Sequence, residues 1–81
     1  IQDKKAQLLL IANKYRIALD EIAYIGDDIN DLECMNIVGV AGCPYDSCDE
    51  VKNIAHYITK KKGGEGAVRE FIEWILKGER R

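Results

Sequence analysis

The sequence predicts an α/β fold in which short parallel strands alternate with helices. Short, uninterrupted apolar runs suit strands that are buried on both faces, as in parallel sheets. Between them lie longer segments that carry apolar residues at helical spacing among strong helix formers. The two patterns alternate along the 81 residues. Such alternation is typical of layered folds with parallel strands and right-handed crossovers.

Two helices are expected near the ends of the chain. The segment from Lys4 to about Tyr15 combines helix formers with a wide apolar face, and Asp3 is placed to cap its start. The last helix is expected from Ala67 to about Lys77, with Gly78 suited to its end. Its apolar residues recur at spacings of three and four: Val68, Phe71, Ile72, Ile75 and Leu76.

The first strand is expected at Ile22 to Ile25, an apolar run that follows a connector at residues 17–21 and is ended by glycine. A helix from Asp28 to about Ile37 follows, and a second short strand is expected at Val38 to Ala41. Pro44 then marks a turn.

The rest of the middle segment predicts one more helix and one more strand. Asp46 or Ser47 is placed to cap a helix that runs to about Ala55. Tyr57 to Thr59 is a short apolar-rich strand, and residues 60–66 form a loop.

So few strands make an incomplete sheet. A strand that is apolar on both faces needs neighbours, and an uncovered edge beside Ile22 to Ile25 would promote aggregation. We therefore expect further strands to come from upstream sequence or from another chain.

Composition excludes several classes of function. With 47% hydrophobic residues, 32% charged residues and a net charge of −2, the chain is typical of a soluble globular domain. No apolar run approaches the roughly 18 residues that span a bilayer, so no membrane association is expected. The basic cluster at residues 60–62 lacks interleaved aromatic residues, so no nucleic-acid binding is expected.

The cysteines and the single histidine predict no further chemistry. Cys34, Cys43 and Cys48 are odd in number and irregular in spacing, which favours a reduced, cytoplasmic protein over a disulfide framework. A structural zinc site would need paired cysteines or more histidines. His56 is expected to be a packed or surface residue.

Three carboxylates lie within five residues directly after the first predicted strand: Asp27, Asp28 and Asp31. Like charges this close repel one another, and a hard divalent cation relieves that cost. Ligand sites in open α/β sheets lie beyond the carboxyl ends of the strands, so the position also favours a metal site. Helix capping by Asp28 and Asp31 is the alternative, and it leaves Asp27 unexplained.

The glycine-rich segment from Gly63 to Gly66 matches neither the dinucleotide-binding nor the P-loop pattern. On the residues alone it is a flexible turn before the last helix. Arg69, which follows it, can pair with Glu73 at helical spacing.

Several motifs together resemble the haloacid dehalogenase superfamily. Lys4 lies twenty-two residues before Gly26-Asp27-Asp28-Ile29-Asn30-Asp31, and Val38-Gly39 and Gly63-Gly64-Glu65-Gly66-Ala67-Val68-Arg69-Glu70 follow. Within the superfamily, the pattern is similar to phosphatases of 3-deoxy-octulosonate 8-phosphate and nonulosonate 9-phosphates. It is also similar to the domain fused to acylneuraminate cytidylyltransferases. The resemblance covers nearly the whole chain.

This resemblance implies a Rossmann-like, three-layer fold, with residues 1–81 forming the carboxyl-terminal half of the domain. It implies Mg²⁺ as the cofactor, with Asp27 as its direct ligand and with Asp31 and Asp28 orienting its waters or that ligand. Lys4 would approach the nucleophile and the transferring phosphoryl group. The nucleophile would come from an upstream Asp-x-Asp pair, which these 81 residues lack, so the chain alone is expected to be inactive.

The remaining roles that the resemblance implies concern the substrate and neighbouring subunits. Asn30, Gly63, Gly64 and Arg69 are candidates for substrate or intersubunit contact, in a homo-oligomer expected to be a tetramer. The leading hypothesis is a phosphatase acting on a phosphorylated keto-deoxy sugar acid. The rival is an oligomerising, non-catalytic domain of a cytidylyltransferase, and a stand-alone metal-binding module is a third hypothesis.

Overall fold

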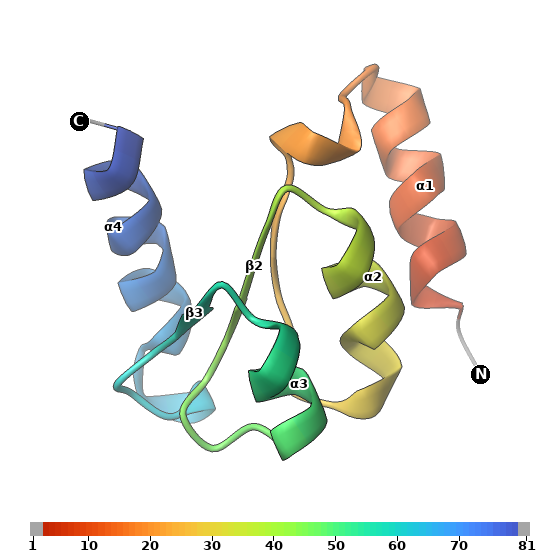
Figure 1. The fold of residues 1–81 in the computed structure, drawn as a ribbon. Coiled ribbons are helices and arrows are strands. Elements are labelled where there is room, and N and C mark those ends of the chain that lie inside the picture. The colour runs from red at the N-terminus through yellow and green to blue at the C-terminus, as the bar shows by residue number, and fades with distance from the viewer. Residues whose placement is uncertain (1–2, 80–81) are drawn as a thin grey trace.

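Three short parallel strands form the sheet in the computed structural model, which describes residues 3–79 (Figure 1). Their order is β1 (Ala23–Ile25), β2 (Val40–Cys43) and β3 (Tyr57–Ile58). Tyr24 lies opposite Ala41 in the first pair of strands, and both pairs are parallel. The predicted α/β fold with a partial parallel sheet is therefore confirmed.

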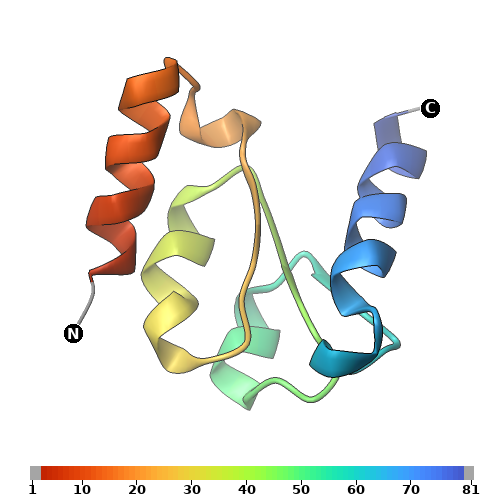
Figure 2. The ribbon, with the colours of Figure 1, turned by 180° about the vertical axis from the view of Figure 1, so that it is seen from behind.

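Helices cover both faces of this sheet. On one face lie α2 (Leu32–Ile37) and α3 (Asp49–Ile54), and α1 (Lys4–Tyr15) lies against α2. The opposite face carries α4 (Ala67–Glu79), as the view from behind also shows (Figure 2). The chain thus has the three layers expected of a Rossmann-like fold.

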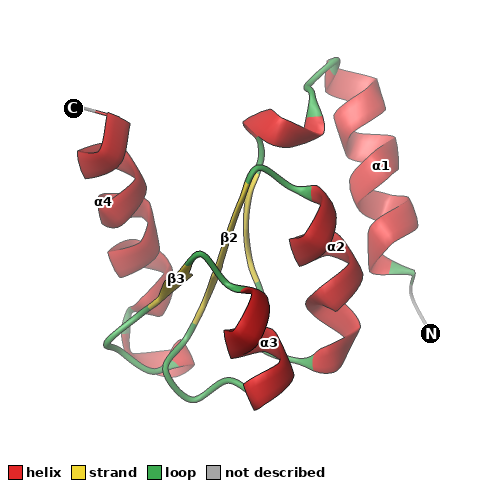
Figure 3. Cartoon of the chain, viewed as in Figure 1, coloured by secondary structure: helices red, strands yellow, loops and turns green. Residues whose placement is uncertain are grey.

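Short 3-10 turns join these elements (Figure 3). They are η1 (Leu19–Glu21), η2 (Ile29–Asp31) and η3 (Gly63–Glu65). The first lies in the expected connector and the last in the expected loop. The second opens the helix predicted from Asp28, so that helix begins as a 3-10 turn and continues as α2.

The core between the sheet and α2 and α3 consists of small and medium apolar side chains: Met35, Val38, Ala41, Cys43 and Val51. On the other face, α4 buries Phe71 and stacks Trp74 on Tyr57 of β3, with ring centroids 4.6 Å apart. Both faces of the sheet are therefore apolar, which agrees with the apolar runs that predicted parallel strands.

The first helix begins where the sequence places it. Asp3 is its N-cap, and its carboxylate accepts the backbone N–H of Ala6 at 3.1 Å. Much of the predicted apolar face is uncovered, however, since Leu10 and Ile11 are 69% and 52% exposed. Ala12 is the buried residue of this helix.

The second strand begins two residues later than predicted. The N–H of Gly39 donates to the carbonyls of Leu19 and Ile22 at 3.0 and 3.1 Å, so this residue ties the strand entry to η1. A Cβ at Gly39 would lie 2.1 Å from the carbonyl oxygen of Asp20. This contact between distant parts of the chain delays the strand to Val40.

Two helix ends also differ from the predictions. Cys48 is the N-cap of α3, and not Asp46 or Ser47. The Asp46 carboxylate accepts the N–H of Gly63 at 3.0 Å instead. Gly78 does not end the last helix, since α4 continues through it to Glu79.

The edge of the sheet at β1 is open in the described part of the chain. Within residues 3–79, β1 pairs with β2 alone, which agrees with the expectation of an incomplete sheet. Between residues 3 and 79, none of the helices has the length and apolar character needed to cross a bilayer.

We predict that Gly39→Ala destabilises the fold by about 1–3 kcal/mol, because its methyl group would press on the backbone of η1. The midpoint of urea unfolding should fall accordingly. Gly78→Ala is the matched control, since a Cβ there meets nothing within 4 Å and alanine favours a helix interior by roughly 0.5–1 kcal/mol. Equal midpoints for the two variants would contradict the assignment of this contact.

Candidate functional site

The candidate site lies in the loop that follows β1. Gly26 begins this loop, and its N–H donates to the carbonyl of Gly42 at 3.0 Å. A Cβ at Gly26 would lie 2.5 Å from the Cβ of Asp31. Glycine is therefore needed here because the Asp31 side chain packs directly on the backbone.

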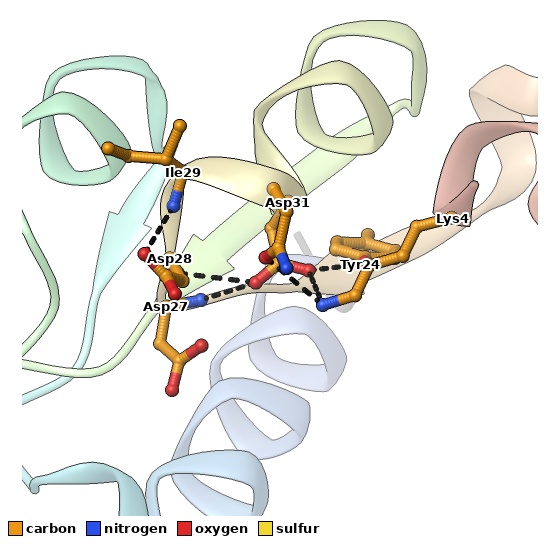
Figure 4. Close-up of polar contacts among 7 residues, drawn as sticks. Lys4, Tyr24, Asp27, Asp28, Ile29 and Asp31 are labelled. Carbon is orange, nitrogen blue, oxygen red and sulfur yellow. Dashed lines mark hydrogen bonds and ion pairs between the residues drawn. The ribbon is translucent and has the colours of Figure 1, made fainter. Parts of the chain in front are cut away.

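The carboxylate of Asp31 is the centre of the site and accepts four hydrogen bonds (Figure 4). One oxygen, Oδ1, accepts from Lys4 Nζ at 2.9 Å and from the Tyr24 hydroxyl at 2.7 Å. The other, Oδ2, accepts the backbone N–H groups of Asp27 and Asp28 at 3.0 and 3.2 Å. Asp31 therefore joins α1, β1 and the loop between β1 and η2.

These bonds decide the charge of the buried carboxylate, whose side chain is 5% exposed. Burial alone would raise the pKa of Asp31, but the bonds from Lys4, Tyr24 and the two backbone N–H groups outweigh it and lower the pKa to about 2. Burial and the bond to Asp31 raise the pKa of the Tyr24 hydroxyl well above its usual range. The aspartate is thus ionised and the tyrosine protonated at neutral pH.

Lys4 brings a positive charge to this carboxylate from the start of α1. Its side chain is 38% exposed, and its ammonium is also 3.3 Å from Oδ1 of Asn30. The hydrogen bond to Asp31 raises the pKa of Lys4 above its usual value. The structure thus brings together Lys4, Asn30 and Asp31, which are all predicted site residues.

The three predicted metal carboxylates do not converge. Asp28 caps η2 by accepting the N–H of Ile29 at 2.7 Å, and Asp31 accepts the N–H of Asp28 at 3.2 Å, so the capping contacts expected for both residues are present. The carboxylate of Asp27 points away from Asp31 (Figure 4). In the part of the chain from residue 3 to residue 79, no group of three or more His, Cys, Asp or Glu side chains lies close enough together to hold a metal ion.

Asp27 nevertheless fits a magnesium ligand. Its exposed carboxylate borders a hollow of about 400 Å³ that it shares with Lys4, Tyr24, Asp31 and Gly63. Mg²⁺ usually takes one or two protein carboxylates and keeps several waters, so one free carboxylate at an open hollow suffices. Pro44, Ala67 and Val68 also line the hollow.

The remaining candidates divide between two places. Gly63 lines the Asp27 hollow, and a Cβ at Gly64 would meet nothing within 4 Å. Arg69 lies elsewhere, in a second hollow of about 680 Å³ with Lys60. Its Nε is 3.7 Å from the Glu73 carboxylate, and their side chains are 86% and 60% exposed. The pairing of Arg69 with Glu73 at helical spacing is therefore confirmed.

Tyr24 is a site residue that the sequence reasoning missed. The sequence pattern presents it only as part of an apolar strand. The connection is visible only in the structure, where Asp31 packs on Gly26 and alternate residues of an extended segment face the same side. A hydroxyl two residues before that glycine is therefore placed to reach the carboxylate.

The lowered pKa of Asp31 predicts acid-dependent stability. The folded state holds this carboxylate ionised down to about pH 2, whereas its ordinary pKa is 3.8. Its contribution to the unfolding free energy is therefore complete above pH 3.8 and is lost as the pH falls toward 2. Asp31→Asn should therefore flatten the pH dependence of the unfolding free energy between about pH 5 and 2. Urea unfolding at several pH values measures this dependence. If the unfolding free energies of wild type and Asp31→Asn changed with pH in parallel, the lowered pKa of Asp31 would be contradicted.

Comparison with known proteins assigns the family. Residues 2–72 match the family model described as haloacid dehalogenase-like hydrolase. The chain is 34% identical over 76 residues to N-acylneuraminate cytidylyltransferase A of Danio rerio, a match that covers 94% of the chain and 18% of that protein. It is 45% identical over 60 residues to phosphoglycolate phosphatase 1 of Saccharolobus solfataricus, covering 74% of the chain and 26% of that protein.

A solved structure agrees with this assignment. The 3-deoxy-D-manno-octulosonate 8-phosphate phosphatase of Moraxella catarrhalis, in complex with a magnesium ion, a phosphate ion and KDO, is 41% identical, with a TM-score of 0.88 over 93% of this chain and 43% of that one. The chain thus spans less than half the length of each of these proteins. From the family match and the shared fold, we conclude that the chain belongs to the haloacid dehalogenase-like hydrolases.

Proposed function

We propose that this chain is the carboxyl-terminal half of a magnesium-dependent phosphatase domain. Its substrate would be a phosphorylated keto-deoxy sugar acid of the 3-deoxy-octulosonate 8-phosphate or nonulosonate 9-phosphate type. The observation that carries the proposal is the placement of the Lys4 ammonium and the Asp27 carboxylate at one hollow beyond the end of β1. The Moraxella catarrhalis structure, a complex with magnesium, phosphate and KDO, supports the cofactor and the substrate class.

Asp27 would hold the metal. Bound Mg²⁺ supplies a positive charge that offsets the charge of a phosphoryl group during transfer. The buried Asp31 keeps the Asp27 backbone in place through the N–H bond at 3.0 Å, and Asp28 fixes the next turn by capping η2. Asp31 and Asp28 would therefore act on the metal through the loop that carries Asp27.

Lys4 would stabilise the negative charge of the transferring phosphoryl group. Its ammonium has three N–H donors, of which Asp31 and Asn30 accept at 2.9 and 3.3 Å. A donor remains for an oxygen in the hollow that Lys4 lines. A fixed charge of this kind favours the transition state because it needs no rearrangement as the reaction proceeds.

The attacking group would come from outside these 81 residues, which contain no Asp-x-Asp pair. We infer that a strand carrying it pairs with the open edge of β1, next to Lys4 and Asp27. Its aspartate would attack phosphorus and release the sugar hydroxyl, and water would then hydrolyse the phosphoaspartate to phosphate. The chain alone would be inactive.

The surroundings of the site support further proposals. Gly63 lines the hollow and Gly64 lies beside it in η3, so this segment would contact the substrate. Arg69 lies outside the hollow, and we propose it as an intersubunit contact in a homo-oligomer, namely a tetramer. The free cysteines at 34, 43 and 48 agree with a reducing, cytoplasmic setting.

A second candidate function is a non-catalytic, oligomerising domain of an acylneuraminate cytidylyltransferase. It is favoured by the match to the Danio rerio enzyme over 94% of the chain. The retained Lys4, Asp27 and Asp31 favour the phosphatase, since a domain relieved of catalysis has no need of them. Phosphate release from sugar-acid phosphates, measured in the whole protein, separates these alternatives, because a non-catalytic domain would release none.

Asp27→Asn should abolish magnesium-dependent phosphate release in the whole protein, because the neutral amide is a poor ligand for a hard cation. Release of inorganic phosphate at several magnesium concentrations measures the effect. Asp49→Asn is the matched control and should retain activity, because Asp49 is an exposed residue of α3. If Asp27→Asn released phosphate as fast as the control, the assignment of Asp27 as the metal ligand would be contradicted.

Lys4→Ala should lower kcat by about 100-fold or more, since it removes a charge aimed at the reacting phosphoryl group. Lys5→Ala is the control, because Lys5 is the neighbouring lysine on α1 and does not line the hollow. Steady-state phosphate release for both variants provides the comparison. A Lys4→Ala enzyme with the kcat of Lys5→Ala would exclude this role.

A further inference from the structure

The Tyr24 hydroxyl makes the shortest of the four bonds to the Asp31 carboxylate, at 2.7 Å. Tyr24 is the middle residue of β1, and its backbone is paired in register with Ala41 of the central strand. Its side chain is half-buried and lines the Asp27 hollow. The hydroxyl that donates to Asp31 is therefore carried by a residue whose backbone is held in the sheet.

Lys4 donates to the same oxygen, Oδ1, but from a different kind of support. Its long side chain is 38% exposed and has several freely rotating bonds, whereas a tyrosine ring has two. The proposed function also requires the Lys4 ammonium to contact the phosphoryl group. One of the two side chains that donate to Asp31 is thus long, partly exposed and also required at the phosphoryl group.

We propose that Tyr24 is a positioning residue that holds Asp31, and through it the Asp27 loop, while Lys4 engages the phosphoryl group. The inference rests on the proposed phosphatase function. It assigns to Tyr24 a role that is separate from that of Lys4, although the two side chains share one carboxylate oxygen.

The geometry explains how the hydroxyl acts at a distance. While Tyr24 fixes Oδ1, the carboxylate plane of Asp31 cannot rotate freely, so Oδ2 stays aimed at the N–H groups of Asp27 and Asp28. These bonds set the backbone that carries the Asp27 carboxylate (Figure 4), and this carboxylate lines the hollow. Without the hydroxyl, the loop would depend on Lys4 alone among side chains.

Tyr24→Phe tests this role in the whole protein because it removes only the hydroxyl. Magnesium binding is measured by titration calorimetry without substrate, and we expect Kd to rise about 10-fold or more, as for other groups that orient metal ligands. KM for the phosphate ester at saturating magnesium should change little. A Kd within about twofold of wild type would overturn the proposal, since a lost positioning group costs more than that.

Tyr57→Phe is the matched control. The Tyr57 hydroxyl on β3 also donates to a carboxylate at 2.7 Å, that of Glu70, and it lines the other hollow. Its removal should change the unfolding midpoint about as much as that of the Tyr24 hydroxyl, with magnesium Kd unchanged. An equal loss of magnesium affinity in both variants would show a general effect on stability and would overturn the proposal.

Lys4→Met is a second variant that decides the matter even if Tyr24→Phe fails to fold. Since Tyr24 still holds Oδ1, magnesium Kd should stay within about twofold of wild type or become tighter through loss of a nearby positive charge, while phosphate release is lost. A Kd raised about 10-fold, the cost of a lost positioning group, would show that Lys4 holds the loop and would overturn the proposal.

The same measurements distinguish a failure of the proposed phosphatase function from a failure of the role proposed for Tyr24. Wild-type protein that neither binds magnesium nor releases phosphate would overturn the proposed function and this role with it. Wild-type protein that does both, with a Tyr24→Phe variant of unaltered magnesium Kd, would overturn the role of Tyr24 alone.

Discussion

The buried carboxylate of Asp31 is the group on which the rest of the site depends. A carboxylate with a side chain 5% exposed is costly unless its charge is met by hydrogen bonds or a counter-ion. Here a cation from α1, a hydroxyl from β1 and two backbone N–H groups meet that need. The same bonds join three separate segments of the chain, so charge compensation also fixes geometry.

This arrangement frees the neighbouring carboxylate. Asp31 is saturated by donors and Asp28 is engaged in capping η2, which leaves Asp27 directed into the hollow. Two of the three acidic residues are therefore engaged in hydrogen bonds within the protein. The repulsion that first pointed to a cation is relieved in this way for Asp28 and Asp31, and Asp27 is the carboxylate for which we propose a metal.

Local patterns predicted the elements well where their causes are local. The spacing of apolar residues placed α4, and the Asp3 cap placed the start of α1. The start of β2 was misplaced because Gly39 contacts η1, nearly twenty residues away. Likewise, the Asp46 carboxylate accepts the N–H of Gly63 and does not cap the start of α3 as the sequence had predicted. Contacts between distant residues leave no periodic trace in a sequence.

The site follows the same rule. The carboxylate cluster after β1 was visible in the sequence, whereas the approach of Lys4 to Asp31, 27 residues apart, could be expected only from the family resemblance. The Tyr24 hydroxyl was hidden because its ring satisfies the apolar pattern of the strand. When a residue belongs to both the core and the site, the sequence pattern reveals its part in the core and does not reveal its part in the site.

The central claim is that Asp31 orders the loop that carries Asp27, and amide hydrogen exchange tests it directly. In the wild-type protein, the N–H groups of Asp27 and Asp28 should exchange slowly, because a buried carboxylate accepts both. In Asp31→Ala these two amides should lose protection, while the Gly26 N–H, which donates to Gly42, keeps it. Equal protection of all three amides in both proteins would contradict the claim.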